Sequence, residues 1–385
     1  MPARESDALI IDAVRSPIGK RNGTLSKIRG DELAAQVLNG LLERHDVDPA
    51  EVEDVQLGCV TQIDEQAWNI GRNVPLTAGW PESVAGTTVD RQCGSSMQTS
   101  FNAATAVWSG QLDLVVSGGV EMMSRVPMGS NNGSMSDRVH ERWQIVPQGI
   151  SAEVIAERWN LSREELDRYS LQSHERAARA MDEGRFAREI VPIDLTNPHV
   201  GVVFDTDEAV RRESTLERMA DLKPAFVEGG KVTAGNSSSI VDGAAGVLIA
   251  SERKAKELGL EPRARFLSFG VVGVDPHVML HGNPQACERA LARAGLAWDD
   301  MDVIEVNEAF ASVVLQFVRD TGLEDRMEDV NPNGGGISLG HPLGATGARI
   351  TATLVNELDR RQARYGIACM CIGFGQAIAA VIERV

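Results

Sequence analysis

The hydrophobic residues of the chain form short apolar runs that alternate with segments of helical period, first over the opening third and again over the last. Short apolar runs predict buried strands, and apolar positions three to four residues apart predict amphipathic helices. The opening third is expected to hold strands at 7–14, 55–60, 86–89 and 112–119 and helices at 31–42, 70–78 and 97–108, with Asp31 as the first N-cap. Strands that alternate with helices favour a parallel α/β sheet with its site at the strand ends.

The middle of the chain, from 121 to about 250, has a different pattern. A Gly/Ser/Asn-rich segment is followed by an expected helix over 161–181 with a Ser162–Glu165 capping box, and then by a loop-rich stretch over 192–235. We interpret this segment as a loop domain or lid inserted into the first α/β unit. Its local positive charge fits an ordinary solvated helix face equally well, because acidic residues interleave with Arg211, Arg212, Arg218 and Lys223.

The last third repeats the order of the first. Strands are expected at 264–272, 301–306, 365–372 and 376–382, and helices at 284–294, 309–318 and 346–358. The helix after the Gly344 turn corresponds to the helix after Cys93, and the strand end at 369–373 corresponds to that at 115–119. This symmetry predicts two similarly wound α/β halves whose strand ends share a cleft. The expected domains are 1–120 with a continuation at about 236–260, the insertion 121–235, and 261–385.

Composition narrows the class of protein. A net charge of −17 argues against a nucleic-acid partner, which would need a basic surface. The sequence has no apolar run that predicts a membrane span and no secretory signal pattern at its start, so we expect a cytoplasmic protein. The five cysteines are odd in number and include no CxxC pair, which argues against a disulfide framework and against a zinc site.

Cys93 is the first candidate for chemistry. It lies at a predicted strand-to-helix junction, within Val89-Asp90-Arg91-Gln92-Cys93-Gly94-Ser95-Ser96-Met97. Free backbone N–H groups and the helix dipole at such a junction favour an anion, which predicts a lowered thiol pKa and a nucleophilic thiolate. The alternative is that Cys93 is a small buried hydrophobe, as many intracellular cysteines are.

Three stretches of the last third carry further reactive residues at predicted turns. They are Asn307-Glu308-Ala309-Phe310, the glycine-rich run around Gly340-His341-Pro342-Leu343-Gly344, and Cys371-Ile372-Gly373. Each has an ordinary explanation: Asn307 as a turn residue, His341 as a helix cap, and Cys371 as core packing like Cys59 and Cys369. The glycine-rich run lacks the Gly-Lys-Ser/Thr ending of a phosphate loop. Together with Cys93, however, they supply a nucleophile, a base, a second acid/base and an amide donor, a set suited to acyl transfer.

These four motifs, in this order over essentially the whole chain, resemble the signatures of the thiolase family. The resemblance implies a five-layered αβαβα fold of two similarly wound halves, with the loop domain inserted in the first half. It implies that Cys93 is the nucleophile, that His341 accepts its proton, and that Asn307 holds a water in an oxyanion site. Cys371 would be the general acid, and the backbone N–H groups of Cys93 and Gly373 would form the second oxyanion hole.

The same resemblance implies that the loop domain binds coenzyme A. Residues matched to CoA contacts in the family are Arg211, Phe226, Ala234, Ser238 and Phe310. CoA and a 3-ketoacyl-CoA would be substrates, with no tightly bound cofactor and no metal. Members of the family form dimers or dimers of dimers, so a homodimer or homotetramer is expected.

Two departures from the family pattern bear on the substrate. Phe374 and Ala377 stand where glycines are usual, which leaves the acyl-chain preference open. Acetoacetyl-CoA-forming members carry a His-Met-Gly in the loop domain, whereas Val146-Pro147-Gln148-Gly149 has no His, which favours the degradative branch. Several loop stretches resemble those of a group of β-oxidation thiolases, some of which act on bulky ring-derived acyl-CoAs. The alternatives are a biosynthetic acetyl-CoA C-acetyltransferase and a non-catalytic acyl-CoA-binding protein; Cys371 argues against a decarboxylating ketosynthase.

Overall fold

The strands of the chain form one large mixed sheet and one small ribbon. The computed structural model describes residues 6–195 and 203–385. In the first half the neighbouring strands are β4 (Ala85–Val89), β3 (Asp54–Gly58), β5 (Leu114–Met122), β8 (Val241–Ala250) and β1 (Leu9–Arg15), with β2 (Gly19–Lys20) also on β8. In the second half they are β10 (Val303–Val306), β11 (Tyr365–Ile372), β12 (Gln376–Arg384) and β9 (Ala264–Gly273). The ribbon pairs β6 (Ile193–Asp194) with β7 (Val203–Phe204).

The two halves repeat one strand order, as the sequence predicted. In the first half β3 runs parallel to β4 and β5, and β8 joins β5 to β1 through antiparallel pairs. In the second half β10 runs parallel to β11, and β12 joins β11 to β9 in the same way. A parallel bridge from Ile304 to Val330 occupies the place that β4 has in the first half. The half-sheets meet where β1 pairs with β9.

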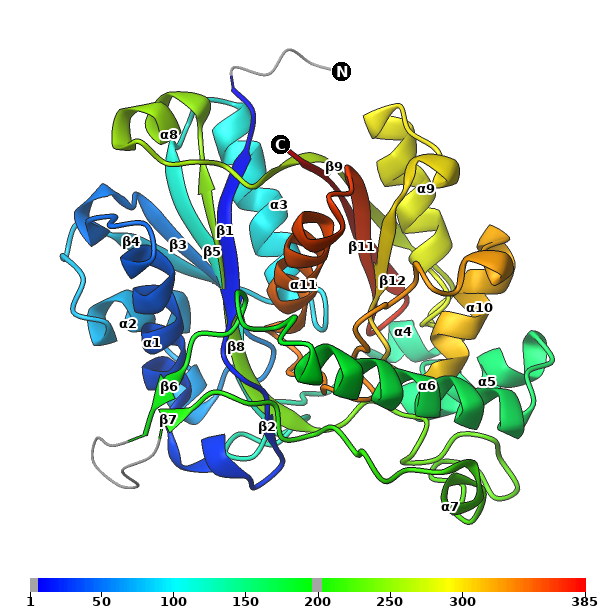
Figure 1. Cartoon of the computed structure of the whole chain (residues 1–385). Coiled ribbons are helices and arrows are strands. Elements are labelled where there is room, and N and C mark those ends of the chain that lie inside the picture. Colours follow the sequence, from blue (N-terminus) through cyan, green and yellow to red (C-terminus); the bar gives the residue numbers. More distant parts are fainter. Residues whose placement is uncertain (1–5, 196–202) are drawn as a thin grey trace.

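The helices complete five layers (Figure 1). Between the half-sheets lie α3 (Ser95–Trp108) and α11 (Thr346–Arg361). The outer layer of the first half holds α1 (Gly30–Glu43) and α2 (Ile70–Thr77), and that of the second holds α9 (Asn283–Ala294) and α10 (Ala311–Thr321). The two central helices touch at their N-termini, since a Cβ on Gly347 would lie 2.3 Å from the backbone nitrogen of Met97. The predicted αβαβα architecture is confirmed.

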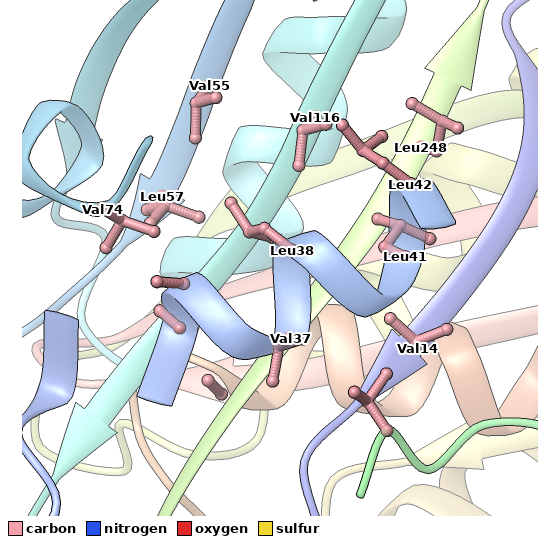
Figure 2. Close-up of a cluster of buried hydrophobic side chains, with 14 of the residues drawn as sticks. Val14, Val37, Leu38, Leu41, Leu42, Val55, Leu57, Val74, Val116 and Leu248 are labelled. Carbon is pink, nitrogen blue, oxygen red and sulfur yellow. The ribbon is translucent and has the colours of Figure 1, made fainter. Parts of the chain in front are cut away.

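Helix α1 shows how the apolar pattern builds these layers (Figure 2). Its apolar stripe packs on β1, β3, β5, β8 and α2 through Val14, Val37, Leu38, Leu41, Leu42, Val55, Leu57, Val74, Val116 and Leu248. The prediction that Asp31 caps this helix is wrong, because α1 begins at Gly30 with Arg29 as N-cap. The Asp31 carboxylate instead accepts hydrogen bonds from the Arg29 guanidinium and the Glu32 N–H within the first turn.

The segment between β5 and β8 contains most of the remaining helices. They are α4 (Asp137–His140), α5 (Gln148–Arg158), α6 (Arg163–Asp182) and α7 (Leu216–Ala220), while α8 (Glu252–Leu258) follows β8. The predicted capping box at the start of α6 is present, with both Ser162 and Glu165 bonded as expected. Short 3-10 helices cover Thr24–Lys27, Pro49–Glu51, Asp64–Gln66, Trp298–Asp300 and Glu324–Arg326. Residues 196–202 of the predicted loop-rich stretch lie outside the described part.

The elements that were not predicted include strand β8 and helix α5. Strand β8 was missed because Gly243, Ala244, Ala245 and Gly246 interrupt its apolar pattern. These small residues let α1 pack closely, since a Cβ on Gly246 would lie 2.8 Å from Leu38. Helix α5 was missed because Pro147 and Gly149 at its start are typical of a turn. Throughout 6–195 and 203–385, the helices fall short of the length and apolarity that crossing a bilayer requires.

Candidate active site

Four loops from the two halves meet where the central helices begin. Cys93 precedes α3, Asn307 follows β10, His341 precedes α11, and Gly373 follows β11. The Ser96 hydroxyl at the start of α3 accepts a 3.0 Å hydrogen bond from the Ala348 N–H at the start of α11, which fixes the Cys93 loop to the His341 loop. The strand ends therefore share one site, as the symmetry of the sequence predicted.

Cys93 is enclosed, with 5% of its surface exposed. Its own N–H, the N–H of Gly373 and the side chain of Gln148 are the hydrogen-bonding groups that favour its thiolate. Burial nevertheless dominates and raises the pKa of the thiol to about 11. The expectation of a lowered pKa is wrong for this resting state, because desolvation of the sulfur outweighs the nearby donors.

His341 is held as a neutral base. Its Nδ1 lies 2.6 Å from the Thr346 hydroxyl, which itself donates to the Pro342 carbonyl at 2.8 Å. Because that hydroxyl proton is engaged, Nδ1 carries the imidazole proton and Nε2 keeps its lone pair. Nε2 lies 3.3 Å from Asn307 Nδ2. Burial, aided by the positive charge of Arg349, lowers the pKa of His341 to about 3.

The second cysteine of the site, Cys371, is buried near the end of β11, opposite Ala377 of β12. Burial raises the pKa of its thiol well above the ordinary value, and the nearby Cys93 raises it further. Cys369, two residues earlier, interacts instead with Cys287 in the hydrophobic core, and Cys59 is also in a core cluster. Cys371 belongs to the same core cluster as Cys369 and Cys287, and what distinguishes it is its proximity to Cys93.

Two buried glutamates hold these loops in place. Neither of them was assigned a role from the sequence. The Glu121 carboxylate accepts hydrogen bonds from Val60 N–H, Thr61 N–H, the Gln66 amide and Gly344 N–H, so it joins the end of β5 to the His341 loop. Glu308 accepts from the hydroxyls of Tyr169 and Ser173 in α6, and from Asn331 and the Ile337 N–H. Glu308 could have been found from the sequence, because it lies within one of the four motifs. Glu121 could not, because its only local feature is that it follows the glycines of β5.

Phe374 has a left-handed backbone conformation, with φ 63°, directly beside Gly373. Residues other than glycine rarely adopt this conformation, which explains why glycine is usual at this position in the family. Its side chain is 46% exposed, so burial does little to offset the strain.

The residues predicted to contact CoA lie in two groups. The rings of Phe226 and Phe310 meet edge to face at 5.9 Å, and the Ser238 N–H donates to the carbonyl of Ala309 beside Phe310. Arg211 lies apart from this group and lines a cavity of about 400 Å³ with His174, Arg212, Ser214, Arg218 and Gly235. Ala234 is exposed and directly precedes Gly235 in the chain.

The cavity around Arg211 contains a histidine that the sequence analysis missed. The Arg211 backbone N–H donates to His174 Nδ1 at 3.1 Å. Burial and the positive charge of Arg211 lower the pKa of His174 to about 4, so the ring is a neutral acceptor that fixes the Arg211 loop. In 6–195 and 203–385, no group of three or more His, Cys, Asp or Glu residues is arranged to hold a metal ion.

The site contains an enclosed cysteine that faces two backbone donors. It also contains a neutral imidazole and a second thiol. These are the groups that acyl transfer between thiols requires. The model of the N-terminal domain of thiolase matches residues 8–253, and that of the C-terminal domain matches 260–384. The chain belongs to the thiolase family.

Individual relatives cover nearly the whole chain. It is 46% identical to the 3-ketoacyl-CoA thiolase of Idiomarina loihiensis, over 98% of this chain and 100% of that protein. It is 47% identical to the steroid 3-ketoacyl-CoA thiolase FadA6 of Mycobacterium tuberculosis, over 98% of this chain and 94% of that protein. The crystal structure of the Bacillus anthracis acetyl-CoA acetyltransferase superposes with a TM-score of 0.92 at 41% identity, covering both chains completely.

Proposed function

We propose that the chain is a degradative 3-ketoacyl-CoA thiolase. It cleaves a 3-ketoacyl-CoA with free CoA, through an acyl-Cys93 intermediate, to acetyl-CoA and a shortened acyl-CoA. The observation that carries the proposal is the combination of Cys93, which two backbone N–H groups approach, with a neutral His341 whose unprotonated Nε2 lies 3.3 Å from Asn307 Nδ2 and can take a proton. The names of the relatives from Idiomarina loihiensis and Mycobacterium tuberculosis support the degradative direction.

In the first half-reaction His341 Nε2 takes the Cys93 proton, and the thiolate attacks the 3-keto carbon. The N–H groups of Cys93 and Gly373 stabilise the oxyanion. The bond between C2 and C3 then breaks, and the acetyl-CoA enolate takes a proton from Cys371. While that enolate forms, its thioester oxygen accepts hydrogen bonds from the protonated His341 and from a water held by Asn307. The buried Asn307 Oδ1 is available to hold that water, because it has no hydrogen-bond partner among the described residues.

In the second half-reaction the Cys371 thiolate takes the proton of an incoming CoA thiol. The CoA sulfur attacks the acyl-Cys93 carbonyl, the Cys93 sulfur leaves, and the proton on His341 returns to it. All residues therefore regain their starting protonation states, and the order of events predicts ping-pong kinetics.

Residues 121–235 act in this proposal as the CoA-binding loop domain, and CoA is a substrate rather than a bound cofactor. The exposed Phe226 with Phe310, Ala234 and Ser238 lies where the pantetheine arm would approach Cys93, since Gly149 packs under Phe226 and Gln148 faces the thiol. The cavity lined by Arg211, Arg212 and Arg218 offers cationic groups to the phosphorylated nucleotide.

The proposal extends to assembly and location. Strand β4 has no neighbour on its outer edge in the described part, and Trp68 and Leu76 near it are exposed, which suits a self-complementary interface in a homodimer or homotetramer. All five cysteines are free, which suits a reducing, cytoplasmic location.

The test is CoA-dependent cleavage of a short and a long 3-ketoacyl-CoA by the native chain and by Cys93→Ala. We expect cleavage of both by the native chain and none by the variant, while Cys287→Ala, a buried cysteine outside the site, stays active. A native chain that condenses acetyl-CoA but cleaves the long substrate hardly at all would favour the second candidate, an acetyl-CoA acetyltransferase, which the Bacillus anthracis structure supports. Tight CoA binding with no reaction in either direction would contradict both.

A further inference from the structure

A side-chain amide near the thiol has no part in the mechanism above. Gln148 is the first residue of α5, in the segment inserted between β5 and β8. Its side-chain amide acts to lower the pKa of the Cys93 thiol, and its Nε2 lies 3.5 Å from the position that a Cβ on Gly373 would take. The amide thus lies at the turn whose Gly373 N–H also favours the Cys93 thiolate.

We propose that Gln148 is a catalytic residue whose side-chain N–H donates to the Cys93 sulfur and stabilises the thiolate together with the two backbone N–H groups. The proposal rests on the thiolase function, in which Cys93 is a nucleophile in one half-reaction and a leaving group in the other. A donor to the sulfur assists both steps, because the sulfur carries negative charge before attack and again as it leaves the acyl group.

The packing of α5 makes this contact a fixed one. The Phe226 ring lies on the backbone of Gly149, where a Cβ would come within 2.2 Å of the ring. The helix is also fastened along its length, since Ser151 donates to the Val278 carbonyl and the Ala152 carbonyl accepts from Ser312. The first residue of α5 is therefore held against the site by neighbours from three other parts of the chain.

Two further features support an assignment to Gln148 itself. Among the described residues its amide has no other hydrogen-bonding partner, so the contact with Cys93 is not a by-product of another bond. Gln92 also approaches Gly373, but its amide is engaged by the carboxylate of Asp90, which leaves Gln148 as the side-chain amide acting on the sulfur.

The test replaces Gln148 by methionine, which keeps the length of the side chain and removes the donor. Alkylation of Cys93 by iodoacetamide reports the thiolate without any CoA substrate. At pH 8 we expect Gln148→Met to react about tenfold more slowly than the native chain and to lose a similar factor in kcat, because one hydrogen bond to a charged group is lost. Gln148→Glu, which places a carboxylate beside the sulfur, is expected to react more slowly still.

The matched control is Gln144→Met, an exposed glutamine four residues earlier, which should change neither rate. Unchanged alkylation rates in both Gln148 variants would overturn the proposal. If kcat fell while the alkylation rate stayed unchanged, Gln148 would only shape the acyl pocket, and the proposal would be overturned as well. Failure of the thiolase function itself is distinguishable, because the native chain would then cleave no 3-ketoacyl-CoA while the alkylation comparison still tests Gln148.

Discussion

At the scale of single residues, the resting site holds a neutral thiol and a neutral imidazole. Burial raises the pKa of Cys93 to about 11 and lowers that of His341 to about 3, so both uncharged forms are favoured across the physiological range. An enclosed site does not have to stabilise an ion pair before substrate arrives. The proton moves when the substrate carbonyl provides a place for the negative charge.

This arrangement predicts the pH dependence of alkylation. Below the pKa of Cys93 the thiolate fraction rises tenfold per pH unit, so the rate of iodoacetamide inactivation should rise about a hundredfold between pH 7 and pH 9. His341 does not titrate in that interval because its pKa lies far below it. A plateau above pH 7 would contradict the prediction, since it would indicate a thiolate–imidazolium pair. Cys93→Ala controls for reaction at the other cysteines.

Thr346 orients His341 and is expected to affect rate more than folding. Thr346→Val removes the acceptor at Nδ1, so the other tautomer or a rotated ring becomes accessible, and kcat/KM should fall by about tenfold to a hundredfold. Thr351→Val is the matched control, because Thr351 bonds a backbone carbonyl of the same helix and lies away from the imidazole. Equal losses in the two variants would show that Thr346 acts only on stability.

Phe374 should be a site of stored strain. Phe374→Gly relieves the left-handed conformation and is expected to raise the free energy of unfolding by about 1 kcal/mol. Phe374→Ala removes the ring but keeps a Cβ in that conformation, so it should give no such gain. Urea denaturation of the three proteins makes the comparison. A loss of stability in the glycine variant would mean that the exposed ring is held by a contact with a partner chain.

Much of the candidate site could be proposed at this scale, because Cys93, Asn307, His341, Cys371 and Gly373 lie in short motifs next to strand ends. The pKa of Cys93 could not, since burial depends on layers contributed by both halves. Gln148 could not be found either, because it reaches the site from the insertion and its own neighbours in sequence predict a turn. Sequence motifs do not identify a residue that only tertiary packing brings to the site.

At the scale of elements, a buried ion cluster fastens the inserted segment to the central sheet. Arg15 at the end of β1 pairs with Glu189 at 2.6 Å and with Asp207 at 2.7 Å, and all three side chains are buried. Asp207 also accepts from the Ile18 N–H. The two carboxylates, on either side of the β6–β7 ribbon, are thereby bound to one cation.

Removing that cation should destabilise the chain strongly. Arg15→Met leaves two carboxylates without their buried partner and is expected to cost about 3–5 kcal/mol of unfolding free energy. Arg168→Met breaks an exposed pair with Glu164 in α6 and should cost less than about 1 kcal/mol. Denaturant titration compares the two. Similar small losses would indicate that water replaces Arg15 in the cluster.

Most elements followed from apolar periodicity, and the exceptions have a physical explanation. Strand β8 lies between β5 and β1, yet its small residues give no alternating pattern, because they serve the close approach of α1 to Gly246. Helix α5 is held by tertiary contacts, including those of Glu153, whose carboxylate accepts from the N–H groups of Lys231 and Val232. In both cases distant packing overrides the local signal.

At the scale of the whole molecule, the site lies where the two halves join. The half-sheets pair through Leu9 with Arg265 and Ile10 with Ala264, and α3 and α11 fill the space between them. Each half supplies one cysteine at the end of a strand or the start of a central helix. In the proposed mechanism the reaction depends on the alignment of the halves, so a contact that stiffens the assembly is expected to affect activity.

The outer edge of β4 is the place where such a contact with a second chain is expected. Trp68 is 90% exposed, and the adjacent Asn69 donates to the Gly86 carbonyl of β4, so the indole lies beside that open edge. Light scattering should give the native protein at least twice the 41.5 kDa mass of one chain. Trp68→Glu places a charge in the interface and should shift the mass toward 41.5 kDa, whereas Val385→Glu, at an exposed apolar residue of the C-terminus, should not. A native monomer would mean that the alignment of the halves rests on the β1–β9 pairing and the central helices alone. An unchanged mass in Trp68→Glu would mean that the chains meet at a surface other than the β4 edge.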